Sequence, residues 1–313
     1  MNRPEPQTAS AVLMIRPTAF HSNPQTAASN AFQREPDAVA NELEQQAAAV
    51  QFESLADVLR AAGVEVVVEA DTNEPATPDS IFPNNWISLH ADGSAVLFPM
   101  MAPNRRTERR MDIVERLGTV HGFRLEKVLD LSAWEQRERF LEGTGSLVLD
   151  RISRVAYACL SPRTDVEVLD DFCQRMGFES LPFHAVDAGG IPIYHTNVMM
   201  AMGRAYAVIC DAAISDPVEH AAVLGRLRQG GREIVSISHE QMAAFAGNML
   251  ELINVDGERL LIMSRRAEAS LNDEQRAVLG KHARLLTAAI DDIEDCAGGG
   301  VRCMLAEIFL PRR

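Results

Sequence analysis

Short runs of apolar residues, separated by polar turn residues, recur along most of the chain. In four segments two such runs flank a turn, as in NNWISLHADGSAVLFP, where Asp92-Gly93 lies between them. Apolar runs of this length around Asp-Gly predict two antiparallel strands joined by a tight turn. The four predicted hairpins begin at Asn84, Glu142, His195 and Asn248.

A helical pattern follows each predicted hairpin. The helix starts rest on capping residues, because Ser, Thr, Asp or Asn before an apolar-periodic stretch satisfies the first free N–H groups. The first prediction is an Arg-rich helix over 105–117, followed by a strand over 123–131. The second helix is predicted to begin at Thr164, which forms a capping box with Glu167. The third is predicted to begin at Asp216-Pro217, with Glu219 in its first turn, and the fourth near Asn272.

A fifth unit of the same kind is predicted to be split between the two ends of the chain. GVRCMLAEIFLP supplies strands at the C-terminus, and AVLMIRP and VEVVVE supply strands at the N-terminus. Between the last two lies a predicted helix from about Pro36 to Ala62, which ends at Gly63. Its apolar positions are Val39, Leu43, Val50, Leu55, Val58 and Leu59.

The units recur about every 55 residues, a period typical of propellers and arrays. Because each unit contains a helix, the predicted fold class is α/β: a pseudosymmetric five-bladed α/β propeller. The predicted organisation is one catalytic domain over residues 10–313. Residues 1–9, which are polar and contain proline, are predicted to form a disordered tail.

Each predicted blade opens with a polar residue. If the first strands surround a common axis, these side chains converge there although they are far apart in the sequence. The residues at the equivalent positions are Asn84 and Asn85, Glu142, His195, Asn248 and Cys303.

Three of these residues form a set with known chemistry. A Cys303 thiolate would be a nucleophile, His195 could activate it or protonate a leaving group, and Glu142 could orient the imidazole. The glycines at 298–300 would leave space at the axis, because they lack Cβ. The alternatives are a cysteine that only fills the core, a histidine satisfied within the core, and a glutamate that caps a turn.

Composition narrows the function classes. The chain has 313 residues, is 47% hydrophobic and carries a net charge of −14, which disfavours nucleic acid and anionic membranes as partners. No apolar stretch approaches the length of a membrane span, and no signal-peptide pattern opens the chain. Five cysteines without a CxxC motif favour a reducing, cytoplasmic environment. Neither a metal nor a cofactor is expected, because no ligand spacing or phosphate loop occurs.

Four motifs together resemble a known superfamily. PDSIFPNNW, FLEGTGSLVL, IYHTNV and GGGVRCML occur in the order found in the guanidine-modifying enzymes, whose fold is the pentein, and the resemblance covers residues from about 11 to 313. Members include arginine deiminases, dimethylargininases and amidinotransferases. The chain is most similar to the branch described as amidinotransferase-like or citrulline-utilisation hydrolases, which carries FPNNW.

The resemblance implies roles for individual residues. Cys303 would be the nucleophile, His195 the general acid/base, and Glu142 the residue that orients the histidine. Asp79 matches a substrate-binding position. Arg105 and Arg163 resemble the arginines that hold the substrate α-carboxylate.

One departure from the superfamily pattern bears on the substrate. Members that act on guanidinium groups carry acidic residues where this chain has Asn84 and Asn85, and several do so at Asn197. A carboxylate only accepts hydrogen bonds, whereas an amide both donates and accepts them, as a neutral ureido group requires. The hypothesis is that the protein hydrolyses citrulline to ornithine, ammonia and carbon dioxide through an S-carbamoyl cysteine. The alternative is that the asparagines only satisfy backbone groups at turns.

Other functions stay open at this point. With the same catalytic residues the protein could hydrolyse arginine or methylarginines, or transfer the amidino group to an amine. A non-catalytic pentein that acts as a binding module is the alternative from another class. The expected partner is a small amino-acid substrate, and exposed hairpins could pair two protomers into a homodimer.

Overall fold

The computed structural model describes residues 5–27, 30, 32–33, 41–72 and 74–313. Within them the strands form five blades of one design: two antiparallel strands, and a third strand parallel to the second. The pairing confirms the predicted hairpins. The blades are β3 (Ile87–Leu89), β4 (Ser94–Leu97) and β5 (Lys127–Asp130); β6 (Val148–Asp150), β7 (Val155–Cys159) and β8 (Glu179–Phe183); β9 (Met200–Met202), β10 (Tyr206–Ile209) and β11 (Glu233–Ser236); β12 (Leu250–Ile253), β13 (Arg259–Ser264) and β14 (Arg284–Ala288); and β15 (Ala306–Ile308), β1 (Ala11–Arg16) and β2 (Glu65–Ala70).

The last of these blades joins the two ends of the chain, as predicted. β1 pairs antiparallel with β15, with Ala11 opposite Ile308, and parallel with β2. One parallel pair, Ile308 with Leu89, also connects β15 to β3, so two blades form a single sheet of six strands. The C-terminal strand is therefore held on both sides, and the segment before it, which carries Cys303, is anchored.

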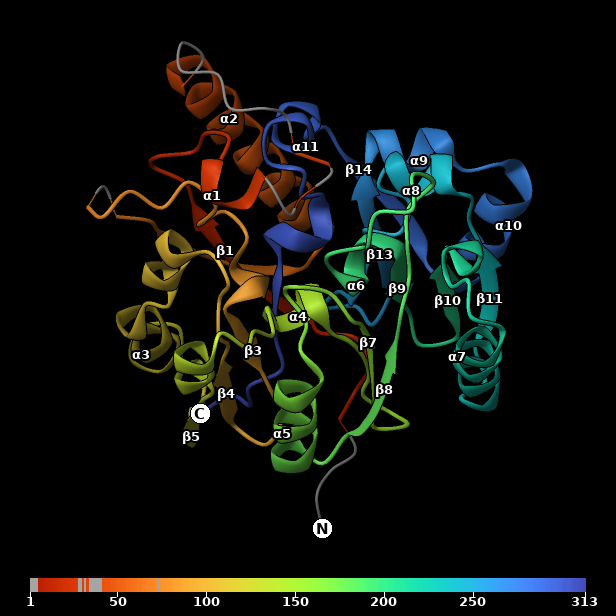
Figure 1. Ribbon diagram of the computed structural model, residues 1–313. Helices are drawn as coiled ribbons and strands as arrows, with labels where there is room; N and C mark the ends of the chain where they lie inside the picture. Colours follow the sequence, from red (N-terminus) through yellow and green to blue (C-terminus); the bar gives the residue numbers. More distant parts are fainter. Residues whose placement is uncertain (1–4, 28–29, 31, 34–40, 73) are drawn as a thin grey trace.

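Helices connect the second and third strands of the blades, because parallel strands need a crossover connection. Figure 1 shows them on the outside of the molecule around the strands. They are α2 (Asn41–Ala61), α3 (Met111–Thr119), α5 (Val166–Met176), α7 (Pro217–Gln229), and α9 (Arg265–Ser270) with α10 (Asp273–His282). The remaining helices are α1 (Pro24–Ala27), α4 (Gly143–Ser146), α6 (Thr196–Met199), α8 (His239–Ala243) and α11 (Asp291–Ala297), and the 3-10 turns are η1 (Pro83–Asn85), η2 (Pro103–Glu108), η3 (Ser132–Arg137), η4 (Asp211–Ala213) and η5 (Val301–Met304).

Two predicted helix starts are confirmed and one is displaced. Asp216 caps α7 by accepting from the backbone N–H groups of Val218 and Glu219, and Asn272 forms a capping box at α10. At α5 the cap is Asp165 instead of Thr164. The hydroxyl of Thr164, which the sequence pattern predicted to cap α5, instead donates to Ser146 Oγ in α4 at 2.8 Å.

The predicted Arg-rich helix over 105–117 is broken in two. A 3-10 turn, η2, precedes α3, and Arg110 between them has an extended backbone. Arg106 of η2 donates to the carbonyl of Met100 at 3.0 Å, and Arg109, which follows η2, pairs with Glu135. These contacts, one local and one with a segment 26 residues away, outweigh the helical propensity of the run.

The prediction of a disordered tail over residues 1–9 is wrong for residues 5–9, and residues 1–4 lie outside the described part. Glu5 pairs with Arg151 and Arg154 at 2.7 Å each. Gln7 donates to the carbonyl of Leu149 and accepts from the N–H of Arg151. The segment is polar because it binds polar partners across the molecule.

The long helix α2 agrees only in part with its prediction. Its predicted start at Pro36 and the position of Val39 lie outside the described residues. Leu55 and Leu59 are buried as expected, whereas Val50 is 70% exposed and Phe52 is fully buried in its place.

Among the described residues, no helix combines the length and apolar character that crossing a membrane requires.

The polar residues that open the blades lie on short turns in the middle of the molecule, not on the strands themselves. Glu142 and His195 directly precede α4 and α6, Asn84 and Asn85 belong to η1, and Cys303 lies in η5. The placement of Cys303 on a strand was therefore wrong by a few residues. The turns η1, α4, α6 and η5 contact one another in sequence-distant pairs, near the middle of Figure 1.

Candidate active site

A small cavity lies among these turns. It brings together five of the nine residues predicted for the site. These are Asp79, Asn85, Arg105, His195 and Cys303. The cavity is further lined by Asn30, Phe82, Tyr194, Ala297, Gly298 and Gly299. The other four predicted residues contact members of this set or lie beside them in the chain.

Cys303 is buried and its thiol is free, with two amide groups pointing at it. Asn248 Nδ2 lies 3.3 Å from Sγ and Asn197 Nδ2 lies 3.5 Å from it. Burial raises the pKa of the Cys303 thiol, and the Asn248 amide and the Arg302 guanidinium act in the opposite direction. Burial is the larger influence, so the net shift is upward and these donors and the cation only reduce it.

The imidazole of His195 is held by Glu142. His195 Nε2 lies 2.8 Å from Glu142 Oε2, and the other carboxylate oxygen accepts from the N–H of Met101 at 3.0 Å. Burial lowers the pKa of His195 to about 4 although Glu142 opposes the shift, so the ring is neutral at pH 7. Burial raises the pKa of Glu142, but Arg163 and His195 outweigh it and the net shift is downward. A neutral imidazole beside an ionised carboxylate is ready to accept a proton.

Arg163 is part of the same charge arrangement. Its Nη1 lies 3.5 Å from Glu142 Oε2, its Nη2 donates to the carbonyl of Thr26, and its guanidinium lies over the ring of Tyr194. The side chain is 3% exposed. Arg163 therefore neutralises the carboxylate that orients His195, and its predicted contact with a substrate α-carboxylate stays a prediction.

Arg105 is fully buried and already paired. Its guanidinium donates to both oxygens of Glu108 at 2.9 Å and to Asn85 Oδ1 at 2.9 Å, and it lies 3.5 Å from Asp79. Burial raises the pKa of Glu108 to about 7, against the influence of Arg105. The guanidinium of Arg105 is held by Glu108 and lies beside Asp79, and it fixes the positions of Asp79 and Asn85. Binding of a substrate carboxylate by Arg105 stays a prediction.

Several buried polar atoms at the site have no hydrogen-bond partner within the described residues. Buried polar groups are normally paired, so a cluster of unpaired ones is typical of a place where a ligand supplies the partners. The unpaired acceptors are Asp79 Oδ1, Asn84 Oδ1 and Asn197 Oδ1, and the unpaired donors are Asn84 Nδ2 and Asn85 Nδ2.

The glycines before Cys303 are required for close approach, mainly by protein atoms. A Cβ on Gly299 would lie 2.6 Å from the ring of Phe82, and one on Gly300 would lie 2.6 Å from Asn248 Oδ1. Gly298 ends α11 with φ +65 and, like Gly299, lines the cavity. A Cβ on Gly298 would likewise lie 2.6 Å from the backbone N of Gln33, so all three glycines admit protein atoms, and open space for a substrate at these glycines stays a prediction.

Three residues at the site had no role in the sequence-based prediction. Asn248 occupies an equivalent blade position, and that signal was present without a function attached to it. Glu108 lies three residues after Arg105, a spacing that places side chains on one helical face. Tyr194 precedes His195 and donates to the carbonyl of Gly298 at 2.9 Å, and nothing in its local sequence indicates that contact.

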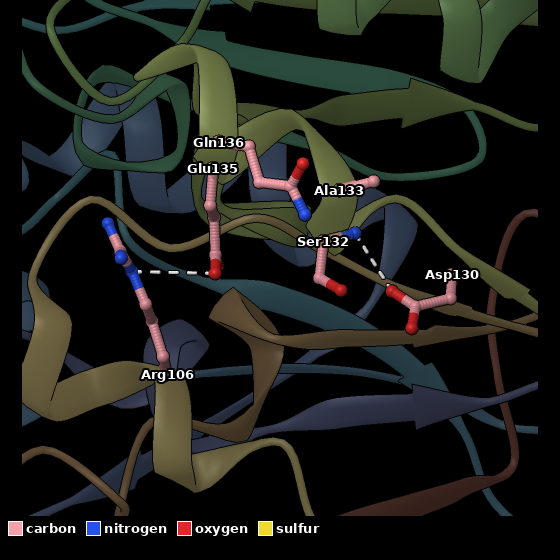
Figure 2. A pocket seen from close by; sticks show the side chains of 6 residues that line it. All are labelled: Arg106, Asp130, Ser132, Ala133, Glu135 and Gln136. Atoms are coloured by element: carbon pink, nitrogen blue, oxygen red, sulfur yellow. Dashed lines mark hydrogen bonds and ion pairs between the residues drawn. The ribbon is translucent and has the colours of Figure 1, made fainter.

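A second, wider hollow of about 780 Å³ contains none of the predicted site residues (Figure 2). It is lined by Arg106, Asp130, Ser132, Ala133, Glu135 and Gln136. Glu135 accepts from the N–H of Met100, and the next residue, Met101, donates to Glu142. Glu135, at this hollow, therefore holds the backbone segment whose next N–H donates to Glu142.

The chain matches the profile of a protein family over residues 16–310, nearly its whole length. The family is described as N,N dimethylarginine dimethylhydrolase, eukaryotic. This chain belongs to that family. With it the chain belongs to the pentein superfamily of guanidine-modifying hydrolases, as the motifs indicated. No curated protein sequence matches the chain.

Solved structures share the fold of this family member at low sequence identity. Unliganded AgrE is 17% identical, with a TM-score of 0.75, over 97% of this chain and 40% of that one, so the chain spans less than half of AgrE. The N-terminal domain of ArgZ, a cyanobacterial arginine dihydrolase bound to its substrate, is 16% identical, with a TM-score of 0.74, over 96% and 98% of the two chains. A dimethylarginine dimethylaminohydrolase, as an adduct with S-methyl-L-thiocitrulline, is 17% identical, with a TM-score of 0.65, over 96% and 99%. These similarities establish the propeller-like pentein fold.

Proposed function

We propose that the protein is a cysteine hydrolase that cleaves a C–N bond at the ureido carbon of citrulline, with Cys303, His195 and Glu142 as its catalytic residues. Family membership supports hydrolysis of a guanidino-type carbon. The finer choice of a ureido substrate rests on two atoms that line the cavity or face it: Asn85 Nδ2, an unpaired donor, and Asp79 Oδ1, an unpaired acceptor.

Those two atoms are complementary to a neutral ureido group. Asn85 Nδ2 would donate to its C=O, and Asp79 Oδ1 would accept from its NH₂. The amide orientation of Asn85 is set, because its Oδ1 accepts from Arg105. A guanidinium has only donors, so it would place an N–H against Asn85 Nδ2 and leave that donor unpaired, at a cost of about 1–3 kcal/mol.

The proposed reaction begins when the Cys303 thiol passes its proton to His195 and the thiolate attacks the ureido carbon. Imidazolium beside Glu142 then protonates the departing nitrogen as the C–N bond breaks, which releases ornithine and leaves an S-carbamoyl cysteine. In the second half His195 takes a proton from water, the hydroxide attacks the carbamoyl carbon, and the thiolate departs. Carbamate decomposes to ammonia and carbon dioxide.

A second candidate is hydrolysis of arginine by the same residues. Asp79 is a carboxylate at the cavity that would suit a cation, and a structure with this fold is described as an arginine dihydrolase bound to its substrate. Complete hydrolysis of arginine gives ornithine, two ammonia and carbon dioxide, so it includes a step at a ureido carbon. The asparagines are compatible with that second step. Methylarginines are a further candidate, because of the family description.

A parallel assay separates these candidates. The purified protein is incubated with citrulline, arginine and asymmetric dimethylarginine, and ornithine, ammonia and dimethylamine are quantified. Equimolar ornithine and ammonia from citrulline supports the proposal. Turnover of arginine or dimethylarginine with citrulline left intact overturns it in favour of the guanidine substrates.

A further inference from the structure

Asn248 makes three hydrogen bonds that connect two blades to the nucleophile. Its Oδ1 accepts from the backbone N–H of Arg302 at 3.0 Å, and its Nδ2 donates to the carbonyl of Asn197 at 2.9 Å and toward Cys303 Sγ at 3.3 Å. Because a backbone N–H must face an oxygen, the amide orientation is set and the NH₂ group is the one that points at sulfur. The side chain is 1% exposed, so water does not compete for these contacts.

The backbone next to Cys303 is built to admit this side chain. A Cβ on Gly300 would lie 2.6 Å from Asn248 Oδ1 and 3.2 Å from its Cγ. The conformation of Gly300, with φ −96, does not itself require glycine. Contact with Asn248 is therefore the requirement that glycine meets at this position.

We propose that Asn248 is a positioning residue that fixes Cys303 and stabilises its thiolate through an N–H···S⁻ hydrogen bond. The proposal rests on the proposed function in one respect, the role of Cys303 as nucleophile. The need for such a donor follows from the site: His195 is paired with Glu142 and neutral, and the sulfur is buried, so the ionised sulfur needs donors of its own. A donor to an ionised acceptor forms a stronger bond than one to a neutral acceptor, so Asn248 favours the thiolate over the thiol.

The charge of the side chain at position 248 can be changed with little change of shape. Asn248→Asp keeps the oxygen that accepts from Arg302 but replaces the donor facing sulfur with a second acceptor that carries charge. Asn248→Ala removes donor and acceptor together. Gly300→Ala keeps Asn248 but displaces it. Asn254→Asp is the matched control, because Asn254 is also buried, accepts from backbone N–H groups through Oδ1, and donates to the carbonyl of Ala62.

The test is the pH dependence of alkylation of Cys303 by iodoacetamide, read from the mass of the peptide that carries it. The pKa of alkylation should rise by about one unit or more in Asn248→Asp, by less in Asn248→Ala and Gly300→Ala, and not at all in Asn254→Asp. The order Asp above Ala is the signature of charge, which a purely structural role would not produce. Thermal melting monitors folding, and Asn248→Ala and Gly300→Ala carry the test if Asn248→Asp does not fold.

An unchanged alkylation pKa in the folded variants overturns the proposal. Alkylation does not require turnover, so the result is independent of the substrate. If the pKa shifts while no substrate is hydrolysed, the role of Asn248 stands and the proposed function fails. If citrulline is hydrolysed while the pKa does not shift, the proposed function stands and the role of Asn248 fails.

Discussion

Two buried clusters in this protein are made of the same three residue types and differ in what surrounds them. At the candidate site His195 pairs with Glu142, which pairs with Arg163. In the other cluster, His90 lies 3.6 Å from Glu5, and Glu5 pairs with Arg151 at 2.7 Å. Burial lowers the pKa of both histidines, so both rings are neutral at pH 7.

The cluster around His90 has its polar groups satisfied by protein atoms. His90 Nε2 bonds Ser88 Oγ at 2.8 Å and Nδ1 lies 3.3 Å from Arg151, while Glu5 also accepts from the N–H of Ala91 and from Arg154. The cluster around His195 lies beside a cavity, a free thiol and amide atoms without partners. The same pair of side chains therefore anchors a chain segment in one place and, in the other, lies where we propose that it transfers protons. Unpaired polar atoms at the cavity are what distinguish the two.

The largest expected difference is between His195→Asn and His90→Asn. His195→Asn should lower kcat/KM by about 10²–10⁴-fold, because the proton acceptor and donor is lost. His90→Asn should leave kcat/KM within about twofold and lower the free energy of unfolding by about 1–3 kcal/mol. Steady-state kinetics and urea unfolding measure both. An equal loss of activity in folded His90→Asn would remove the distinction between the clusters.

Replacing the carboxylates should give a smaller difference in the same direction. Glu142→Gln keeps the shape but loses the charge that orients and stabilises imidazolium, and kcat should fall by about 10–10³-fold. Glu5→Gln should affect stability and leave kcat unchanged. Pre-steady-state release of ornithine measures the step that Glu142 supports. Full activity in Glu142→Gln would mean that His195 needs no ionised partner.

Charge at the cavity should alter substrate preference more modestly. Asn85→Asp introduces an acceptor that favours a cation, so the ratio of kcat/KM for arginine to that for citrulline should rise about tenfold. The effect is limited because Arg105 already pairs with this side chain. Competition assays with both substrates measure the ratio, and Asn254→Asp is the control. A ratio that does not move would show that Asn85 does not contact the reacting group.

The smallest expected effect is the contribution of Glu5 to acid stability. Burial raises the pKa of Glu5, but Arg151 and His90 outweigh it and lower the pKa from 4.5 to about 2. A lowered folded-state pKa means that the contribution is complete above pH 4.5 and is lost as the pH falls toward 2. Between pH 6 and pH 3 the wild-type protein should lose about 1–2 kcal/mol more than Glu5→Gln. Parallel urea titrations at the two pH values test this, and equal losses would contradict the assignment.

The fold could be predicted from the sequence where local signals and tertiary structure agree. The turn at Asp92-Gly93 and the caps Asp216 and Asn272 are signals of this kind, because the structure that they specify lies within a few residues. The recurrence of these units also predicted that the first and last strands pair, as β1 and β15 do.

Predictions failed where a distant partner decides the outcome. Thr164 bonds Ser146 instead of capping α5, and Arg109 bonds Glu135 instead of continuing a helix. Glu5 looks like part of a polar tail until Arg151 is placed beside it.

The candidate site also has features that the sequence could predict and features that it could not. The repeat indicated that Glu142, His195 and Cys303 converge, and the structure brings the turns that carry them together. The repeat could not indicate that Glu108 pairs with the guanidinium of Arg105, or that Asn248 contacts the sulfur of Cys303. Both contacts depend on the directions of the side chains. The roles of the individual site residues therefore remain predictions until activity is measured.

The most direct test of the account is the chemical state of Cys303 during turnover. Wild-type protein is mixed with citrulline, quenched in acid during turnover and digested, and the Cys303 peptide is weighed. The account predicts a carbamoyl group on that peptide, absent without substrate and absent in Cys303→Ser. Turnover of citrulline with an unmodified Cys303 peptide, or continued turnover in Cys303→Ser, would contradict it.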